Sequence, residues 1–167
     1  MVRFFLGFVV LQALLFGTEL TPWAQRWFVV PWTDTLAAVS AGIVKIFDPG
    51  VMADGKLLQS GSNGFAVSIE AGCNGVEATI VLVAAILAFP APWKRKFLGL
   101  SIGIAAVQGL NIIRVISLFY LGQWSLDAFD FAHQYLWQAL IMLDVLIVWL
   151  LWVRTVPRPM PSSAAAA

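Results

Sequence analysis

The only cysteine, the only histidine and an arginine inside an apolar stretch have side chains suited to acyl transfer. Cys73 lies in Glu70-Ala71-Gly72-Cys73-Asn74-Gly75, directly before an apolar segment. At the start of a helix, free backbone amides and the positive end of the dipole lower a thiol pKa and can donate to an oxyanion. His133 could take the thiol proton and return it to a leaving amine. Arg114 could stabilise the thiolate and the oxyanion.

Each of these residues also has a simpler structural interpretation, which the sequence leaves open. A lone cysteine in an apolar span is usually a small hydrophobic side chain, and His133 could be a surface imidazole that opens the last span. Arg114 shares a helix face with Asn111 and Gln108, and this stripe must face the interior of a bundle because such groups are costly in lipid. The stripe could serve helix packing alone, or Asn111 could orient Arg114 for catalysis.

Other polar or small residues are expected to support the site. Glu70 could orient the imidazole or contact a substrate, and Asn74 and Gly75 follow the thiol at the predicted start of the helix. Two acids are assigned elsewhere: Glu77 to a structural hydrogen bond or to tuning of the site, and Asp144 to pairing within the bundle. Helix-end and arginine effects compete with desolvation, so the sequence leaves the direction of the thiol pKa open.

The composition places these residues in a membrane protein. Of 167 residues, 60% are hydrophobic and 11% are charged, and the mean hydropathy is +0.87. Ten Lys and Arg balanced by nine Asp and Glu exclude the basic patch of a nucleic-acid-binding protein. One cysteine and one histidine exclude a disulfide framework and an ordinary zinc site. Neither a metal nor a cofactor is expected.

Hydropathy predicts an all-α polytopic membrane protein with about four transmembrane helices. The predicted spans are 4–20, 73–90, 97–120 and 134–153. Basic residues flank them at Arg3, at Lys94-Arg95-Lys96, and at Arg154 with Arg158, so these groups are placed in the cytoplasm. The segment 21–72 then faces the periplasm. Residues 1–158 are predicted to form a single membrane-embedded domain, and a disordered tail is predicted over 159–167.

The outward-facing segment contains two predicted features. The stretch 27–47 is interpreted as an amphipathic helix from about Thr33 on the outer interface, although it could also form a fifth span. If it crosses, the N-terminus moves outside and the later spans keep their direction. A β-hairpin is predicted from 56–60 and 65–69, because Asn-Gly lies in the connection between them.

Helix rise converts sequence distance into depth. Cys73 lies 21 residues before Lys94, and His133 lies 21 residues before Arg154, which places both ~31 Å from the cytoplasmic basic groups. Arg114 lies 18 residues after Lys96, at ~27 Å. All three reach the outer boundary of a hydrocarbon core ~30 Å thick. The spans therefore bring a thiol, a guanidinium and an imidazole to one plane.

These residues resemble the exosortase/archaeosortase family of membrane cysteine transpeptidases. The match covers roughly residues 51–152 and includes Glu70-Ala71-Gly72-Cys73-Asn74-Gly75, then Asn111-Ile112-Ile113-Arg114, then His133. The short chain is most similar to exosortase H, which is associated with substrates carrying an Ile-Pro-Thr-Leu type C-terminal signal. Larger exosortases carry additional spans at the front.

The resemblance implies a sorting enzyme of the bacterial inner membrane, embedded in lipid, with its active site facing the periplasm. Its substrates would be exported proteins that end in a short motif, a transmembrane helix and a basic cluster. Cys73 would be the nucleophile, Arg114 the oxyanion or thiolate partner, and His133 the general acid and base. An unidentified acceptor nucleophile would resolve the acyl enzyme.

Two other functions compete with this interpretation. Buried Glu77, Arg114 and Asp144 could belong to an ion or proton conduit, or to a non-catalytic subunit of an export system. A conduit needs polar groups through the whole membrane thickness, whereas the reactive residues cluster at one depth. The chain could also be a protease that hydrolyses without transfer, which only the product would reveal.

Overall fold

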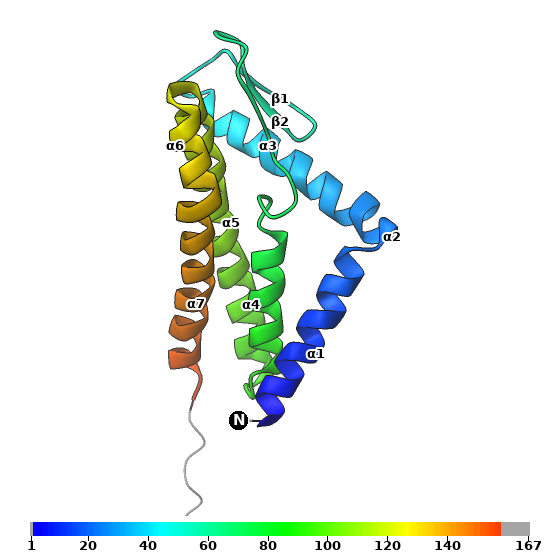
Figure 1. The fold of residues 1–167 in the computed structure, drawn as a ribbon. Helices are drawn as coiled ribbons and strands as arrows, with labels where there is room; N and C mark the ends of the chain where they lie inside the picture. Colours follow the sequence, from blue (N-terminus) through cyan, green and yellow to red (C-terminus); the bar gives the residue numbers. More distant parts are fainter. Residues whose placement is uncertain (1, 158–167) are drawn as a thin grey trace, which may run out of the picture.

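The computed structural model describes residues 2–157, so Arg158 and the predicted tail lie outside the described residues. This part of the chain is mostly helical and carries one small antiparallel sheet at one end (Figure 1). In chain order the elements are α1 (Val2–Glu19), α2 (Pro22–Ala24), the π-helical η1 (Gln25–Val29), α3 (Val30–Val44), β1 (Val51–Asp54), β2 (Leu57–Ser60), β3 (Ala66–Ser68), α4 (Val76–Ala88), α5 (Trp93–Trp124), α6 (Leu126–Phe131), the π-helical η2 (Ala132–Leu136) and α7 (Trp137–Thr155).

Four helices of the described chain are long and apolar enough to cross a membrane: Val2–Glu19, Pro22–Val44, Trp93–Trp124 and Leu126–Thr155. A polytopic helical protein is thereby confirmed. The two C-terminal helices are longer than the predicted spans 97–120 and 134–153. The first of them is a single helix from Trp93 to Trp124. The second begins directly after Ser125, whose side chain caps it by accepting a hydrogen bond from the Ala128 N–H.

The predicted span over 73–90 is wrong in its length, because α4 has 13 residues. Gly72 and Gly75 have φ angles of 81° and 73°, which keeps the residues up to Gly75 outside the helix. At the other end Phe89 is extended before Pro90, as the residue preceding a proline usually is. A loop therefore occupies the place where the sequence predicted the first turn of a helix.

The helix Pro22–Val44 lies obliquely across one end of the bundle, beneath the sheet (Figure 1). Its α3 part buries Leu36, Ala37, Ala41 and Val44. This buried face packs against the sheet and α5. The helix predicted from about Thr33 therefore exists, and its position on the outer interface stays a prediction.

The predicted hairpin is confirmed and belongs to a larger sheet. β2 and β3 pair antiparallel, with Leu57 opposite Ser68 and Gln59 opposite Ala66. The sheet has the order β1-β2-β3, and sequence reasoning missed β1. The sequence does contain a signal for β1, the Asp-Gly pair at 54–55, which forms the turn between β1 and β2 with a φ of 54° at Gly55.

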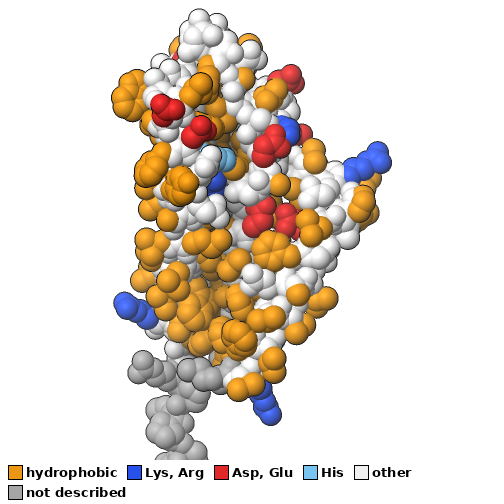
Figure 2. Space-filling view, in the orientation of Figure 1, with side chains coloured by type: hydrophobic (Ala, Val, Ile, Leu, Met, Phe, Trp, Pro, Cys, Tyr) orange, Lys and Arg blue, Asp and Glu red, His pale blue; other side chains and the backbone are white. Residues whose placement is uncertain are grey.

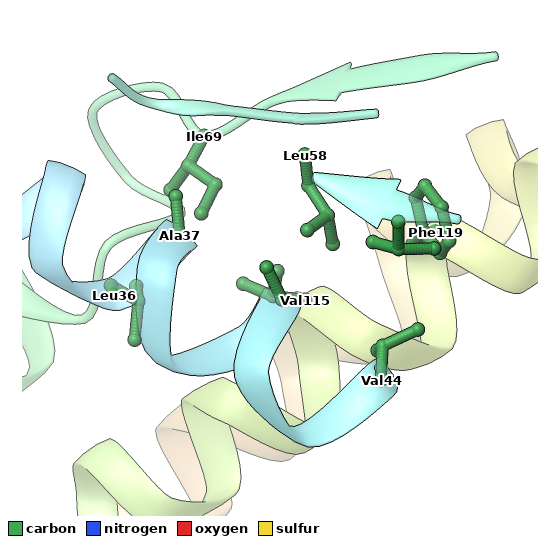
Figure 3. Close-up of a cluster of buried hydrophobic side chains, with 9 residues drawn as sticks. Leu36, Ala37, Val44, Leu58, Ile69, Val115 and Phe119 are labelled. Carbon is green, nitrogen blue, oxygen red and sulfur yellow. The ribbon is translucent and has the colours of Figure 1, made fainter. Parts of the chain in front are cut away.

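Two of the apolar clusters pack against α5. The first lies between α3, the sheet and α5, where Leu58 and Phe119 are fully buried (Figure 3). The second lies between α4, α5 and α7, around Leu82 and Ile141. Since the sheet and α4 both pack on α5, the loop that joins them is held against the same helix.

Candidate active site

The loop carrying Cys73 joins β3 to α4 and touches α5 at Gly75. A Cβ atom at Gly75 would lie 2.9 Å from Gln108 Oε1 and 3.1 Å from Asn111 Nδ2. Gln108 Nε2 donates to the Gly75 carbonyl at 3.1 Å and to Thr79 Oγ1 at 2.9 Å. Gly75 therefore serves two purposes, a positive φ and a close approach to α5.

Asn74 attaches this loop to α3. Its buried side chain donates from Nδ2 to Thr33 Oγ1 at 3.1 Å and accepts from the Val76 N–H at 3.1 Å. Trp32 Nε1 donates to the Asn74 carbonyl at 3.1 Å. Asn74 therefore binds the first amide of α4 and fixes the loop to α3, and sequence reasoning missed the contributions of Trp32 and Thr33.

The amide of Cys73 itself and the amide of the residue before it are already hydrogen-bonded. The Cys73 N–H donates to the Glu70 carbonyl at 2.9 Å, and the Gly72 N–H donates to Glu77 Oε1 at 2.6 Å. Of the two roles predicted for Glu77, a structural hydrogen bond or tuning of the site, the hydrogen bond is thus present. These two amides are not free to act as oxyanion donors, because each already donates a hydrogen bond within the protein.

Arg114 supplies the positive charge beside the thiol instead. Its side chain is 2% exposed. Nη2 lies 3.4 Å from Cys73 Sγ, and Nη1 donates to the Gly72 carbonyl at 3.1 Å. One guanidinium thus holds the loop and the sulfur together.

His133 completes the cluster from the other side. Its Nε2 and Nδ1 atoms lie 3.8 Å and 3.9 Å from Cys73 Sγ. Contrary to the prediction, His133 does not open its helix, because Leu126 does and His133 lies inside the π-helical segment η2. The extra residue in a π-helical turn changes the direction of the side chains that follow. Figure 2 shows hydrophobic side chains gathered over the lower half of this face of the molecule.

Phe129 orients the imidazole by stacking. The two ring centroids are 5.6 Å apart and the planes differ by 10°. Glu70 does not take this role, since its carboxylate accepts from Lys56 Nζ at 2.7 Å and from Ser68 Oγ at 2.6 Å. These bonds lower the pKa of Glu70. Sequence reasoning missed this stacking, although residues four apart on a helix, such as Phe129 and His133, are neighbours on its surface.

Two predicted contacts are absent among the described residues. Asn111 is fully buried beside Gly75, but neither atom of its amide has a hydrogen-bond partner, so it does not orient Arg114 by such a bond. Asp144 Oδ2 likewise has no partner within residues 2–157. The predicted pairing of Asp144 is therefore wrong.

Burial decides the direction of the thiol pKa. Desolvation raises the pKa of Cys73, the Arg114 charge opposes this, and Glu77 and Glu70 add to the rise. The thiol is therefore protonated at neutral pH, and its reactivity depends on a base. A small cavity of about 30 Å³ reaches it, lined by Val67, Ser68, Ile69, Cys73, Arg114, Val115, Leu118, Phe129 and His133.

The fold and this cluster define a multi-pass membrane protein with a cysteine, a histidine and an arginine gathered at one end of its bundle. Residues 1–153 match the family model of transmembrane exosortases, and the chain belongs to this family. Membership suggests a peptidase-type enzyme and implies a role in processing C-terminal sorting signals. No curated protein and no solved structure gives a significant match to the chain.

Proposed function

We propose that this protein is a membrane cysteine transpeptidase or endopeptidase that cleaves the C-terminal sorting signal of exported proteins. One observation carries the proposal: Cys73 Sγ lies between Arg114 Nη2, at 3.4 Å, and His133 Nε2, at 3.8 Å. Such an arrangement suits an activated thiol nucleophile. Family membership favours the bacterial inner membrane, and the basic flanks of the spans favour an orientation in which this site faces the periplasm.

The proposed reaction has two halves. His133 takes the Cys73 proton, and the thiolate attacks the carbonyl carbon of a peptide bond near the sorting motif. Arg114 stabilises the oxyanion, and His133 returns the proton to the amine as the C–N bond breaks and the tail helix leaves. An acceptor amine or other nucleophile, deprotonated by His133, then attacks the thioester and regenerates the thiol.

The distribution of buried polar groups along α5 supports an enzyme rather than a conduit. On α5 the buried residues between Lys96 and Gln108 are Gly99, Gly103 and Val107. This apolar interval of twelve residues spans ~18 Å. A conduit would need polar groups along it.

The test is co-expression with an exported protein that ends in an Ile-Pro-Thr-Leu motif, a transmembrane helix and a basic cluster. The parental chain should remove the tail, and Cys73→Ala should not, as measured by the intact mass of the substrate. Thr35→Ala, which removes an exposed hydroxyl bound to the main chain, should cleave like the parent. Equal processing by the parent and Cys73→Ala would overturn the proposal. The mass at the new C-terminus distinguishes transfer from hydrolysis.

A further inference from the structure

The strand β3 is an edge of the sheet, and it leads directly into the loop that carries Cys73. The sheet order β1-β2-β3 leaves one side of β3 unpaired. Val67, Ser68 and Ile69 line the small cavity together with Cys73 and His133. The unpaired edge therefore faces the space between β3 and the helix that carries His133.

The register identifies which main-chain groups are free at this edge. The Ser60 N–H donates to the Phe65 carbonyl and the Ile69 N–H donates to the Lys56 carbonyl, so alternate residues from Phe65 to Ile69 bond to β2. In an antiparallel ladder the residues between them point the other way. Ala66 and Ser68 thus present their N–H and C=O groups outward, as an unpaired template for another extended chain.

The direction of β3 matches the direction of a substrate. Phe65 packs against Gly122 of α5, and Cys73 meets Arg114 eight residues nearer the cytoplasmic end of the same helix. The chain from β3 to the thiol therefore descends ~12 Å toward the membrane. A substrate whose tail helix enters the membrane from outside runs the same way.

We infer that the segment of the substrate just before its transmembrane helix adds to β3 as a parallel strand. Ala66 and Ser68 hold its backbone, which delivers the scissile bond to Cys73. Main-chain pairing of this kind supplies affinity, and alternate side chains supply specificity. Side chains on the inner face of the added strand meet Leu118 and Phe129, which favours apolar residues at every second position. This inference rests on the proposed function.

Disulfide mapping tests this pairing, because Cys73→Ala leaves a chain with no cysteine. Ala66→Cys and Ser68→Cys are each added to that background. Single cysteines are scanned through ten consecutive positions before the tail helix of the Ile-Pro-Thr-Leu substrate. Adjacent strands lie ~4.8 Å apart, within the Cα separation that a disulfide accepts. Met52→Cys, an exposed position on the opposite edge strand, is the matched control.

Crosslinks from Ala66→Cys should peak at every second substrate position and exceed those from Met52→Cys at least fivefold. Moving the probe to Ser68→Cys should shift the peak two positions toward the substrate C-terminus. Uniform crosslinking, crosslinking equal to the control, or a shift toward the N-terminus would overturn the inference. Cleavage by the parental chain is measured on the same substrate. If the parent cleaves and the pattern is absent, only the strand pairing fails, whereas no cleavage by the parent refutes the proposed function as well.

Discussion

Replacing Gly75 with alanine should destabilise the protein more than the same change at a glycine with the same φ angle. Gly75 and Gly64 both have a φ of 73°. A Cβ atom at Gly64 would meet nothing within 4 Å, whereas at Gly75 it would press on the Gln108 amide at 2.9 Å. The pair therefore separates the cost of the backbone conformation from the cost of the close approach.

The expected magnitudes follow from these contacts. A left-handed conformation costs an L-residue about 1–2 kcal/mol, and this applies to both Gly75→Ala and Gly64→Ala. Only Gly75→Ala also displaces Gln108, which donates to the Gly75 carbonyl and to Thr79 Oγ1. Leaving such buried groups unsatisfied costs about 1–3 kcal/mol more. The difference between the two variants should therefore be about 1–3 kcal/mol.

The assay is equilibrium unfolding of both variants in detergent micelles, paired with cleavage of the tailed substrate. Gly75→Ala should also slow cleavage, because the Cys73 loop moves away from Arg114, while Gly64→Ala should leave cleavage near the parental rate. Gly72→Ala, with a φ of 81° and open space around it, gives a second measure of the backbone cost. Equal free energies of unfolding for Gly75→Ala and Gly64→Ala would refute the close-approach argument.

Three further predictions concern protonation and the hydrogen bonds of the loop. Burial raises the Cys73 pKa and the Arg114 charge opposes this rise, so Arg114→Met should raise the Cys73 pKa further. The pH profile of Cys73 alkylation by a neutral reagent should then move to higher pH. An unchanged profile would contradict the role of the Arg114 charge. Asn74→Ala should lower the free energy of unfolding by about 2–4 kcal/mol, because the buried Thr33 hydroxyl and Val76 N–H lose their hydrogen-bond partner. The matched change Asn63→Ala, at an exposed position, should lower it by about 1 kcal/mol. Glu70, whose pKa is lowered mainly by its lysine partner, stabilises the fold at pH values above the unfolded pKa. That contribution is lost as the pH falls through the folded pKa. In a pH series of unfolding free energies, Glu70→Gln should therefore reduce the loss of stability at low pH, by less than about 1 kcal/mol because the ion pair is exposed.

The depth argument from sequence works because α5 is one uninterrupted helix. From Trp93 to Trp124 each residue adds ~1.5 Å, so the depth of Arg114 can be predicted from its distance to Lys96. The depth of Cys73 was obtained as if a helix continued to Lys94, although α4 covers only Val76–Ala88. The contact between Arg114 and Cys73 nevertheless puts both at one level.

What sequence reasoning missed depends on contacts between distant segments. Spacing indicates that Gln108, Asn111 and Arg114 share a face, but not that Gly75 packs against this face. Trp32 and Thr33 hold Asn74 across more than forty residues, and no local pattern encodes such a pairing. Local patterns did predict the hairpin, because the geometry of a turn depends on its own residues.

The distances around the thiol indicate when the nucleophile becomes active. Burial keeps Cys73 protonated, and both imidazole nitrogens lie 3.8–3.9 Å from its sulfur, so neither is favoured as the base. Catalytic hydrogen bonds in unliganded sites often shorten only when substrate binds. A peptide strand added beside β3 would exclude water from the cavity that Cys73 shares with His133, and this strengthens the interaction of the ion pair formed by proton transfer. The thiolate would then form where an extended peptide is already in place, which protects a lone cysteine from oxidation in the absence of substrate.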